Sequence, residues 1–201
     1  MDPKAMFKIG YGLYVLTTHD GDKQNGCIVN SVMQVTSSPN RICVAVNKSN
    51  HTHNRILENK FFNVSVLTEK ASFDIFKRFG FQSGRDVDKF KDYPHVKMAA
   101  NDVYYITEGT NAYISAYVVE TIDLETHTLF IANVVNAVVL NDDASVTYDY
   151  YQKNIKPAPG ETKKKGWVCK VCGYVYEGEE LPPDFICPLC KHGAEEFEKL
   201  S

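Results

Sequence analysis

Four cysteines near the C-terminus are the clearest chemical feature of this sequence. They form two Cys-x-x-Cys pairs, Cys169 with Cys172 and Cys187 with Cys190, and fourteen residues separate the pairs. Each pair can turn two thiolates toward one point, so that two pairs enclose a metal ion in a tetrahedral cage of sulfur ligands. The spacing predicts a metal site and leaves zinc and iron equally open.

The residues around these cysteines favour iron. Five aromatic side chains lie in the same short segment, namely Trp167, Tyr174, Tyr176, Phe185 and Phe197. A buried aromatic environment limits the access of solvent to a metal, and solvent access is one of the factors that set a redox potential. An iron ion held by four thiolates would transfer single electrons, whereas zinc would only stabilise the fold of the segment.

Polar side chains in two earlier segments could line a pocket for an anion. The first segment covers residues 25–37 and the second covers residues 47–54, at an expected helix start. The second segment also contains Lys48 and two histidines, His51 and His53. Free backbone amides and the helix dipole favour phosphate at such a place. Polar strand positions that face water and a solvated turn would give the same pattern, so the residue types alone do not decide.

Short stretches rich in β-branched and aromatic residues predict the elements that hold these side chains. The expected strands are 11–18, 27–36, 42–47, 61–67, 112–122 and 128–140, with turn signals between them. Ser49-Asn50 predicts the start of a helix over 51–59. Apolar spacing predicts a second helix over 72–79, which Gly80 would end. We therefore expect a mainly β domain, a barrel or a sandwich, with accessory helices.

A change of composition divides the chain near residue 155. The segment 156–166 has two prolines, two glycines and a run of lysines, and its largest apolar side chain is Ala158. We expect a domain over 1–152, a linker over 153–165 and a small domain over 166–201. A chain of about 36 residues seldom folds without a metal or disulfides, so the metal would also stabilise the small domain.

The overall composition argues against several classes of function. The 201 residues carry a formal net charge of −3 without a Lys/Arg stripe, so nucleic acid is not an expected partner. No apolar stretch approaches the roughly 20 residues of a membrane-spanning helix, and Met1–Lys8 lacks the apolar run of a secretory signal. We expect a cytoplasmic protein in which Cys27 and Cys43 are small buried apolar residues.

The C-terminal segment resembles the short rubredoxin domains that are fused to other redox proteins. The resemblance rests on residues 167–178, 182–190 and 197–199. It implies one iron ion bound by the four cysteines. Two features depart from the free-standing rubredoxins: the segment between the cysteine pairs is shorter, and Lys191 stands where a glycine usually follows the fourth cysteine.

Residues 7–151 resemble the flavin reductase-like family of FMN-binding split β-barrels, which includes flavoredoxins and ferric reductases. Four blocks carry this resemblance, namely Gly26–Thr36, Asn47–Thr52, Phe79–Phe90 and His127–Ile131. The resemblance implies an FMN-binding split β-barrel with NAD(P)H as electron donor. It also implies a homodimer, with the flavin near the subunit interface.

The family's site residues can be carried over to the matching positions. Asn30, Ser31 and Gln34 would contact the isoalloxazine ring and the ribityl chain of FMN. The residues expected around the phosphate are Asn47, Lys48, His51, Thr52 and His53. Ser83–Phe90 would lie over the flavin, with Arg85 as its charged contact. His127 would lie near the nicotinamide, although a histidine at a strand end could equally hold a turn.

Together the two halves resemble the high-molecular-weight rubredoxins of anaerobes. This resemblance implies an electron-transfer flavoprotein that receives electrons from NAD(P)H, directly or through a reductase, and passes them through FMN to iron. The implied acceptor is a flavodiiron protein that reduces oxygen or nitric oxide. Two alternatives stay open: a free-flavin or ferric reductase with a stabilising tail, and a flavin-binding module with a structural zinc ribbon.

Overall fold

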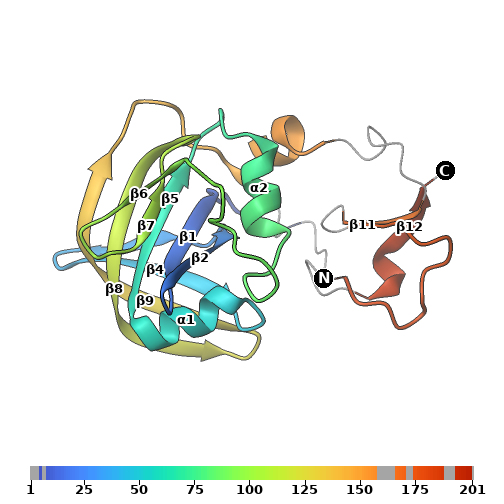
Figure 1. The fold of residues 1–201 in the computed structure, drawn as a ribbon, viewed down its shortest axis with the longest axis horizontal. Helices are drawn as coiled ribbons and strands as arrows, with labels where there is room; N and C mark the ends of the chain where they lie inside the picture. Colours follow the sequence, from blue (N-terminus) through green and yellow to red (C-terminus); the bar gives the residue numbers. More distant parts are fainter. Residues whose placement is uncertain (1–4, 6–7, 158–165, 171–173, 188–192, 201) are drawn as a thin grey trace. The chain divides into compact units, whose positions relative to one another are not determined.

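The computed structural model describes residues 5, 8–157, 166–170, 174–187 and 193–200 (Figure 1). The chain divides into two compact units between Ile155 and Lys156, and each unit is described by itself. The larger unit is a β-barrel with helices on its outside, and the smaller one has a three-stranded sheet. In the described part of the chain, no helix has the length and apolar character needed to cross a membrane.

The larger unit is mainly β, as the sequence predicts. Its strands are β1 (Tyr14–Asp20), β2 (Lys23–Val29), β3 (Met33–Ser37), β4 (Asn40–Asn47), β5 (Phe61–Leu67), β6 (Val96–Met98), β7 (Tyr104–Ile106), β8 (Thr110–Leu124) and β9 (His127–Val139). Its helices are α1 (His51–Asn59), α2 (Phe73–Gly80) and α3 (Tyr148–Tyr150), and a π-helical turn, η2 (Tyr151–Ile155), follows α3.

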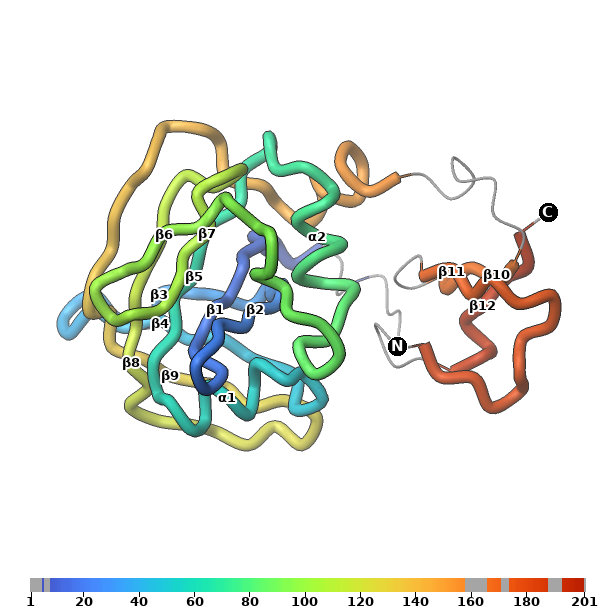
Figure 2. The backbone as a smooth tube through the Cα atoms, in the orientation of Figure 1, coloured from blue at the N-terminus to red at the C-terminus, as the bar shows by residue number. Residues whose placement is uncertain are grey.

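One antiparallel sheet of seven strands closes into the barrel (Figure 2). The strand order is β2-β1-β5-β8-β9-β4-β3, so β2 and β3 lie at opposite edges of the sheet. Because only residues 30–32 join these two strands, the sheet has to curl until its edges are neighbours. Ser31 extends the pairing of β3 with β4 beyond Met33: its hydroxyl donates to the Ala45 carbonyl oxygen (2.9 Å) and accepts from the Ala45 N–H (3.1 Å).

Apolar side chains are buried on both faces of the central strands. Successive side chains of a strand point to opposite faces, and β1 illustrates the result. Leu16 belongs to the cluster inside the barrel with Val44 and Phe62. Val15 belongs to a second cluster, together with Phe76 of α2. The sheet therefore supports α2 on its outside while it keeps a closed core within.

The structure bears out most of the predicted elements and corrects one. The helix over 51–59 and the strand over 61–67 have the predicted bounds. The prediction of a single strand over 27–36 was wrong, because the chain leaves β2 after Val29 and starts β3 at Met33. The interruption is the crossing between the two sheet edges. Cys27 and Cys43 are buried as expected, each 6% exposed.

The smaller unit has a compact sheet. Its strands are β10 (Gly166–Cys169), β11 (Val175–Tyr176) and β12 (Phe197–Leu200), in the antiparallel order β11-β10-β12. A single 3-10 turn, η3 (Ala194–Glu196), leads into β12. Cys169 at the end of β10 lies opposite Phe197 at the start of β12.

Candidate functional site

The predicted anion segment forms the turn between β4 and α1. Asn47 ends β4, and its side-chain oxygen accepts a hydrogen bond from the backbone N–H of Ser49 (2.8 Å), which turns the chain toward the helix. The first turn of α1 contains no acidic side chain. The helix itself therefore adds no negative charge at the positive end of its dipole, where an anion is favoured.

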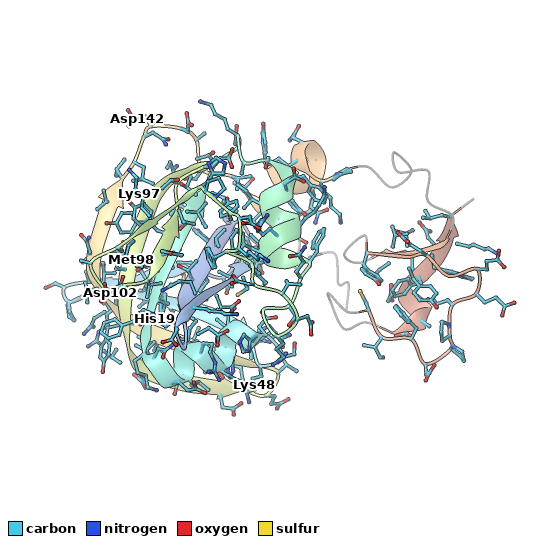
Figure 3. All side chains as sticks on the ribbon, viewed as in Figure 1. His19, Lys48, Lys97, Met98, Asp102 and Asp142 are labelled. Carbon is cyan, nitrogen blue, oxygen red and sulfur yellow. The ribbon has the colours of Figure 1, made fainter. Side chains whose placement is uncertain are left out.

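Lys48 is half-buried on this turn and lies close to the start of α1 (Figure 3). Its ammonium pairs with Asp123 near the end of β8 at 2.7 Å, and its backbone N–H donates to the carbonyl of Thr126 (3.0 Å). The hydrogen bond from Lys48 lowers the pKa of the Asp123 carboxyl group. These contacts hold the turn against the end of the β8–β9 hairpin.

The first residues of α1 are tied to three different strands. His51 Nε2 lies 2.8 Å from a carboxylate oxygen of Asp20, at the end of β1. The Thr52 hydroxyl accepts from the side-chain amide of Asn25 in β2 (2.8 Å), and Thr52 is 1% exposed. His53 Nε2 lies 2.8 Å from the Thr128 hydroxyl of β9. The predicted phosphate segment therefore has a fixed backbone.

His53 is buried, whereas Lys48 is half-buried, although both were predicted to lie around the flavin phosphate. It is 4% exposed, and its ring meets Phe130 edge-on at 5.6 Å. Its two ring nitrogens face Thr128 and the side chain of Asn54. These contacts give His53 a supporting position beneath the turn.

Gln34, predicted to contact flavin, lies on the same strand pair as Asn47 but further along it. Gln34 pairs with Ile42 of β4, five residues before Asn47, which corresponds to about 17 Å along a strand. Its side-chain amide donates to the Asn40 side chain (2.9 Å). Asn30 and Ser31 lie between these points, in the half-buried crossing from β2 to β3. The predicted flavin contacts therefore lie in order along the β3–β4 strand pair, from Gln34 toward the start of α1.

Arg85 and His127 lie at the α1 end of this series. Arg85 donates from Nη1 to the carbonyl of Ser49 (2.9 Å), which joins the 83–90 loop to the turn before α1. His127 begins β9 and pairs directly with Asn47. Its Nδ1 lies 2.9 Å from the Thr126 hydroxyl. The fold brings residues from four predicted blocks to one end of the barrel.

Two buried polar residues near this end, Asn25 and Lys89, were not among the predicted site residues. Asn25 is 2% exposed and Lys89 is 4% exposed, and both lie close to the buried Cys27 in sequence or charge interaction. Burial raises the pKa of the Cys27 thiol, and burial lowers the pKa of the Lys89 ammonium. The position of Lys89 within Asp-Val-Asp-Lys-Phe-Lys suggests a solvated loop, so only the fold reveals that its side chain turns inward.

A polar hollow opens where the 84–88 segment meets the β1–β2 turn. Its walls include Lys23 and Arg85, and also three carboxylates, those of Asp20, Asp86 and Asp88. The carboxylates would repel a phosphate. Asp86 and Asp88 belong to the hollow, whereas the carboxylate of Asp20 is paired with His51 and Arg55 of α1, so the start of α1 is the better place for an anion.

The smaller unit contains two of the four predicted metal ligands in its described part. Cys169 is 1% exposed and Cys187 is 0% exposed, and both belong to one buried cluster. The backbone N–H of Cys169 donates to the Tyr174 carbonyl (2.8 Å). Cys172 and Cys190 lie outside the described residues.

Aromatic rings enclose these two thiols. Phe185 lies 5.3 Å from Phe197 and 4.7 Å from Tyr176, measured between ring centres. Burial raises the pKa of the Tyr174 hydroxyl, and the nearby Cys187 sulfur adds to the shift. Two buried thiols in a largely apolar shell fit a thiolate-ligated metal shielded from water.

Comparison with known proteins identifies the two domains of this chain. The family model "Flavin reductase like domain" matches residues 6–159, and the model "Rubrerythrin, rubredoxin-like domain" matches residues 167–198. The chain belongs to the flavin reductase-like family. Its flavin reductase-like domain accounts for the barrel, and its rubredoxin-like domain accounts for the four cysteines.

Similar proteins support the assignment of both domains. Over its whole length the chain is 35% identical to the high molecular weight rubredoxin of Moorella thermoacetica, which it also covers completely. The ferric-chelate reductase (NAD(P)H) of Archaeoglobus fulgidus is 41% identical over 75% of this chain and 89% of its own length. The solved NADH:FAD oxidoreductase of Streptomyces globisporus matches 73% of this chain and 90% of its own, with a TM-score of 0.63 and 22% identity.

These matches confirm the resemblance to high-molecular-weight rubredoxins and the split-barrel fold of the flavin reductase-like domain. A flavin-binding fold and a rubredoxin-like domain on one chain support an oxidoreductase that transfers electrons through flavin and iron.

Proposed function

We propose that this protein transfers electrons from NAD(P)H through FMN to a one-iron site and on to a protein acceptor. The observation that carries the proposal is the presence of both domains on one chain. When bound, a flavin can take up two electrons from a nicotinamide and give them up singly, which matches the donor to a one-electron iron site. The chain's own residues bind and orient the two groups.

The flavin phosphate is assigned to the turn before α1. Asn47, Lys48, His51 and Thr52 belong to that turn or to the first residues of the helix, where amide groups and the dipole favour an anion. His53 would support the turn from below through its contact with Thr128. FMN ends in a phosphate, and this position would bind it.

The ring system would then extend toward the crossing between β2 and β3. Asn30, Ser31 and Gln34 would contact the isoalloxazine ring and the ribityl chain. The distance of about 17 Å between the β4 partners of Gln34 and His127 is compatible with the length of an extended FMN molecule. Arg85 would contact the flavin from the 83–90 loop, and His127 would orient the nicotinamide.

Cys169, Cys172, Cys187 and Cys190 would bind the iron ion. The buried positions of Cys169 and Cys187 support iron ligation, and the ring of Phe185 would help exclude water. The soft thiolate ligands also suit zinc, so iron rests on the rubredoxin-like match. In a reducing compartment such as the cytoplasm the four thiols remain available for a metal.

A second copy of the chain is the proposed partner in a homodimer. Several apolar side chains are exposed on β3 and on the neighbouring strands β8 and β9, with β4 between β9 and β3: Met33, Val35, Val119, Ile122, Leu124, Val135, Val138 and Val139. Val139 is 73% exposed and Met33 is 59% exposed. Apolar patches of this kind commonly mark protein interfaces. Val135→Glu combined with Met33→Glu should give a monomer in sedimentation analysis.

The first test is the visible spectrum of the full chain, purified without added cofactors and recorded before and after anaerobic addition of NADH or NADPH. We expect bands of bound flavin and of ferric thiolate, both bleached by the nicotinamide. Bands that persist until a separate reductase is added would make the protein a carrier fed by that reductase. A colourless small domain containing zinc would overturn the proposed iron site.

Cysteine variants test the order of transfer. Cys169→Ala should abolish the ferric thiolate band and electron delivery to an added flavodiiron protein, while bound flavin is still reduced. The matched control is Cys43→Ala, which removes a buried thiol from the barrel and should leave the iron band intact. Unchanged delivery by Cys169→Ala would show that iron does not lie on the route.

A second candidate function is direct reduction of a ferric chelate at the barrel. The 41% identity to the ferric-chelate reductase of Archaeoglobus fulgidus favours this candidate. It requires only the flavin site, so Cys169→Ala should retain full ferric-chelate reduction. Flavin that separates from the protein during gel filtration would instead favour a free-flavin reductase.

A further inference from the structure

Arg41 is the only Asp, Glu, Lys or Arg residue on strands β3, β4 and β9. Its side chain is half-buried, and its Nε donates a hydrogen bond to the side-chain oxygen of Asn133 in β9 (2.9 Å). In the described part of the chain no carboxylate lies within ion-pair distance of its guanidinium group. A guanidinium group held through Nε keeps its two Nη groups in a fixed fork that suits carbonyl and anionic ligands.

Arg41 lies on the same face of β4 as Asn47. Side chains alternate between the two faces of a strand, and the core inside the barrel contains Ile42, Val44 and Val46. Arg41 and Asn47 therefore both lie on the outer face of β4. They are six residues apart, which corresponds to about 20 Å along a strand. The isolated positive charge thus stands at the opposite end of β4 from the turn before α1.

The side chains around Arg41 suit the carbonyl end of a flavin ring. Thr36 of β3 and Asn133 of β9 pair with Arg41 on either side, and both can form hydrogen bonds. Between Arg41 and the turn before α1, the same face of β4 carries only the small uncharged side chains of Cys43 and Ala45. An isoalloxazine ring has carbonyl oxygens and ring nitrogens at one end and methyl groups at the other. The hydrogen-bonding surroundings of Arg41 therefore favour the carbonyl end.

We propose that Arg41 contacts the carbonyl end of the flavin ring and stabilises the negative charge that the ring gains on reduction. The inference rests on the proposed function, which assigns the flavin phosphate to the turn before α1 and the ring to the far part of the β3–β4 pair. Transfer of a hydride from NAD(P)H to the neutral ring leaves NAD(P)⁺ and gives the ring one negative charge until a proton follows. A nearby guanidinium group stabilises this charged form more than the neutral oxidised form. Arg41 therefore raises the reduction potential of the bound flavin.

The test compares the Kd of oxidised FMN with the Kd of reduced FMN, both measured by anaerobic equilibrium dialysis against the flavin-free full chain. Arg41→Met removes the charge and keeps an unbranched side chain. It should raise the Kd for reduced FMN about tenfold, the scale of one hydrogen bond to a charged group, and leave the Kd for oxidised FMN within roughly twofold. A tenfold change in the ratio of the two constants lowers the potential of a two-electron couple by about 30 mV. A spectroelectrochemical titration of the flavin bands measures this shift independently.

Three further variants separate the effect of charge from that of packing. Arg41→Lys retains the positive charge and should keep the ratio of the two Kd values within about threefold of the wild-type ratio. Lys97→Met removes a charge from an exposed lysine of β6 (Figure 3) and is the matched control, which should change neither constant. Arg41→Gln can still donate to Asn133 without a charge, so it replaces Arg41→Met in the test if that variant does not fold.

Three results would overturn the inference. They are an unchanged Kd for reduced FMN in Arg41→Met, equal losses for the oxidised and reduced forms, and a change of sedimentation from dimer to monomer, which would show that Arg41 pairs with a second copy of the chain. A wild-type chain that binds neither form of FMN would refute the proposed function itself, and the inference with it. A wild-type chain that binds both forms, while Arg41→Met binds them equally well, refutes only the role of Arg41.

Discussion

Replacement of Phe197 by alanine tests whether the aromatic cluster holds the smaller unit closed around its metal site. The Phe197 side chain is 7% exposed, lies opposite Cys169 and meets Phe185 edge-on at 5.3 Å. Truncation of a buried phenylalanine to alanine costs about 3–5 kcal/mol. A unit of 46 residues has a total stability of roughly 2–7 kcal/mol at typical values per residue. The substitution therefore removes much of the stability of this unit.

The rate of iron loss reports this change. A cost of about 3 kcal/mol raises the population of the opened unit more than about a hundredfold, since every 1.4 kcal/mol is a factor of ten. Iron released into excess chelator, followed by the colour of the chelator complex, should accelerate accordingly. Phe197→Leu retains most of the apolar volume and should accelerate release less than about tenfold. Equal release rates from the Ala and Leu variants would refute the reasoning.

Three substitutions in the barrel have expected effects on its free energy of unfolding, measured by urea denaturation of the flavin-free chain. Ser31→Ala should cost about 2 kcal/mol, because it leaves the backbone N–H and carbonyl of Ala45 without the serine hydroxyl. His53→Ala should cost about 2–4 kcal/mol through loss of the Thr128 contact and of buried ring surface. Tyr93→Phe should be neutral or stabilising at pH 7, because the buried Tyr93 hydroxyl has no hydrogen-bond partner in the described structure. Burial raises the pKa of Tyr93 to about 12 from its usual 10.0. The stability that depends on the protonated hydroxyl is therefore complete below pH 10 and is lost as the pH rises from 10 toward 12. The Phe variant should lack that decline between pH 10 and 12.

Short-range sequence signals predicted the helices and strands whose first and last residues are determined by their neighbours in the sequence. The helix over His51–Asn59 follows from its start signal and apolar spacing, and the strand over Phe61–Leu67 follows from its β-branched and aromatic residues. The break between Val29 and Met33 has a different cause. It follows from closure of the barrel, which depends on strands distant in the sequence, and no residue type in that stretch marks it.

The same distinction applies to the candidate site. The polar block from Asn47 to His53 was visible in the sequence because a helix start has a recognisable composition. Its division into a half-buried Lys48 and a fully buried His53 depends on β9, whose Thr128 and Phe130 contact the His53 ring. Lys89 was missed because a lysine between charged residues is expected in solvent. Only the meeting of β2 and α2 provides the carbonyls of Gly26 and Phe79 that accept its hydrogen bonds.

The three-residue crossing from β2 to β3 has a consequence for folding kinetics. The long β8–β9 hairpin has its two strands joined by residues 125 and 126 and can form early, because its contacts are local. The contact of Ser31 with Ala45 is local as well, because it continues the β3–β4 register in which Met33 lies opposite Cys43. Asn25 in the edge strand β2, by contrast, can meet Thr52, which follows β4, only after the sheet has curled and its two edges have come together. Asn25→Ala should therefore speed unfolding of the flavin-free chain and leave the refolding rate almost unchanged, with a φ-value near zero. Substitutions in the β8–β9 hairpin should instead slow refolding, so that the barrel assembles from this hairpin and closes last between β2 and α1.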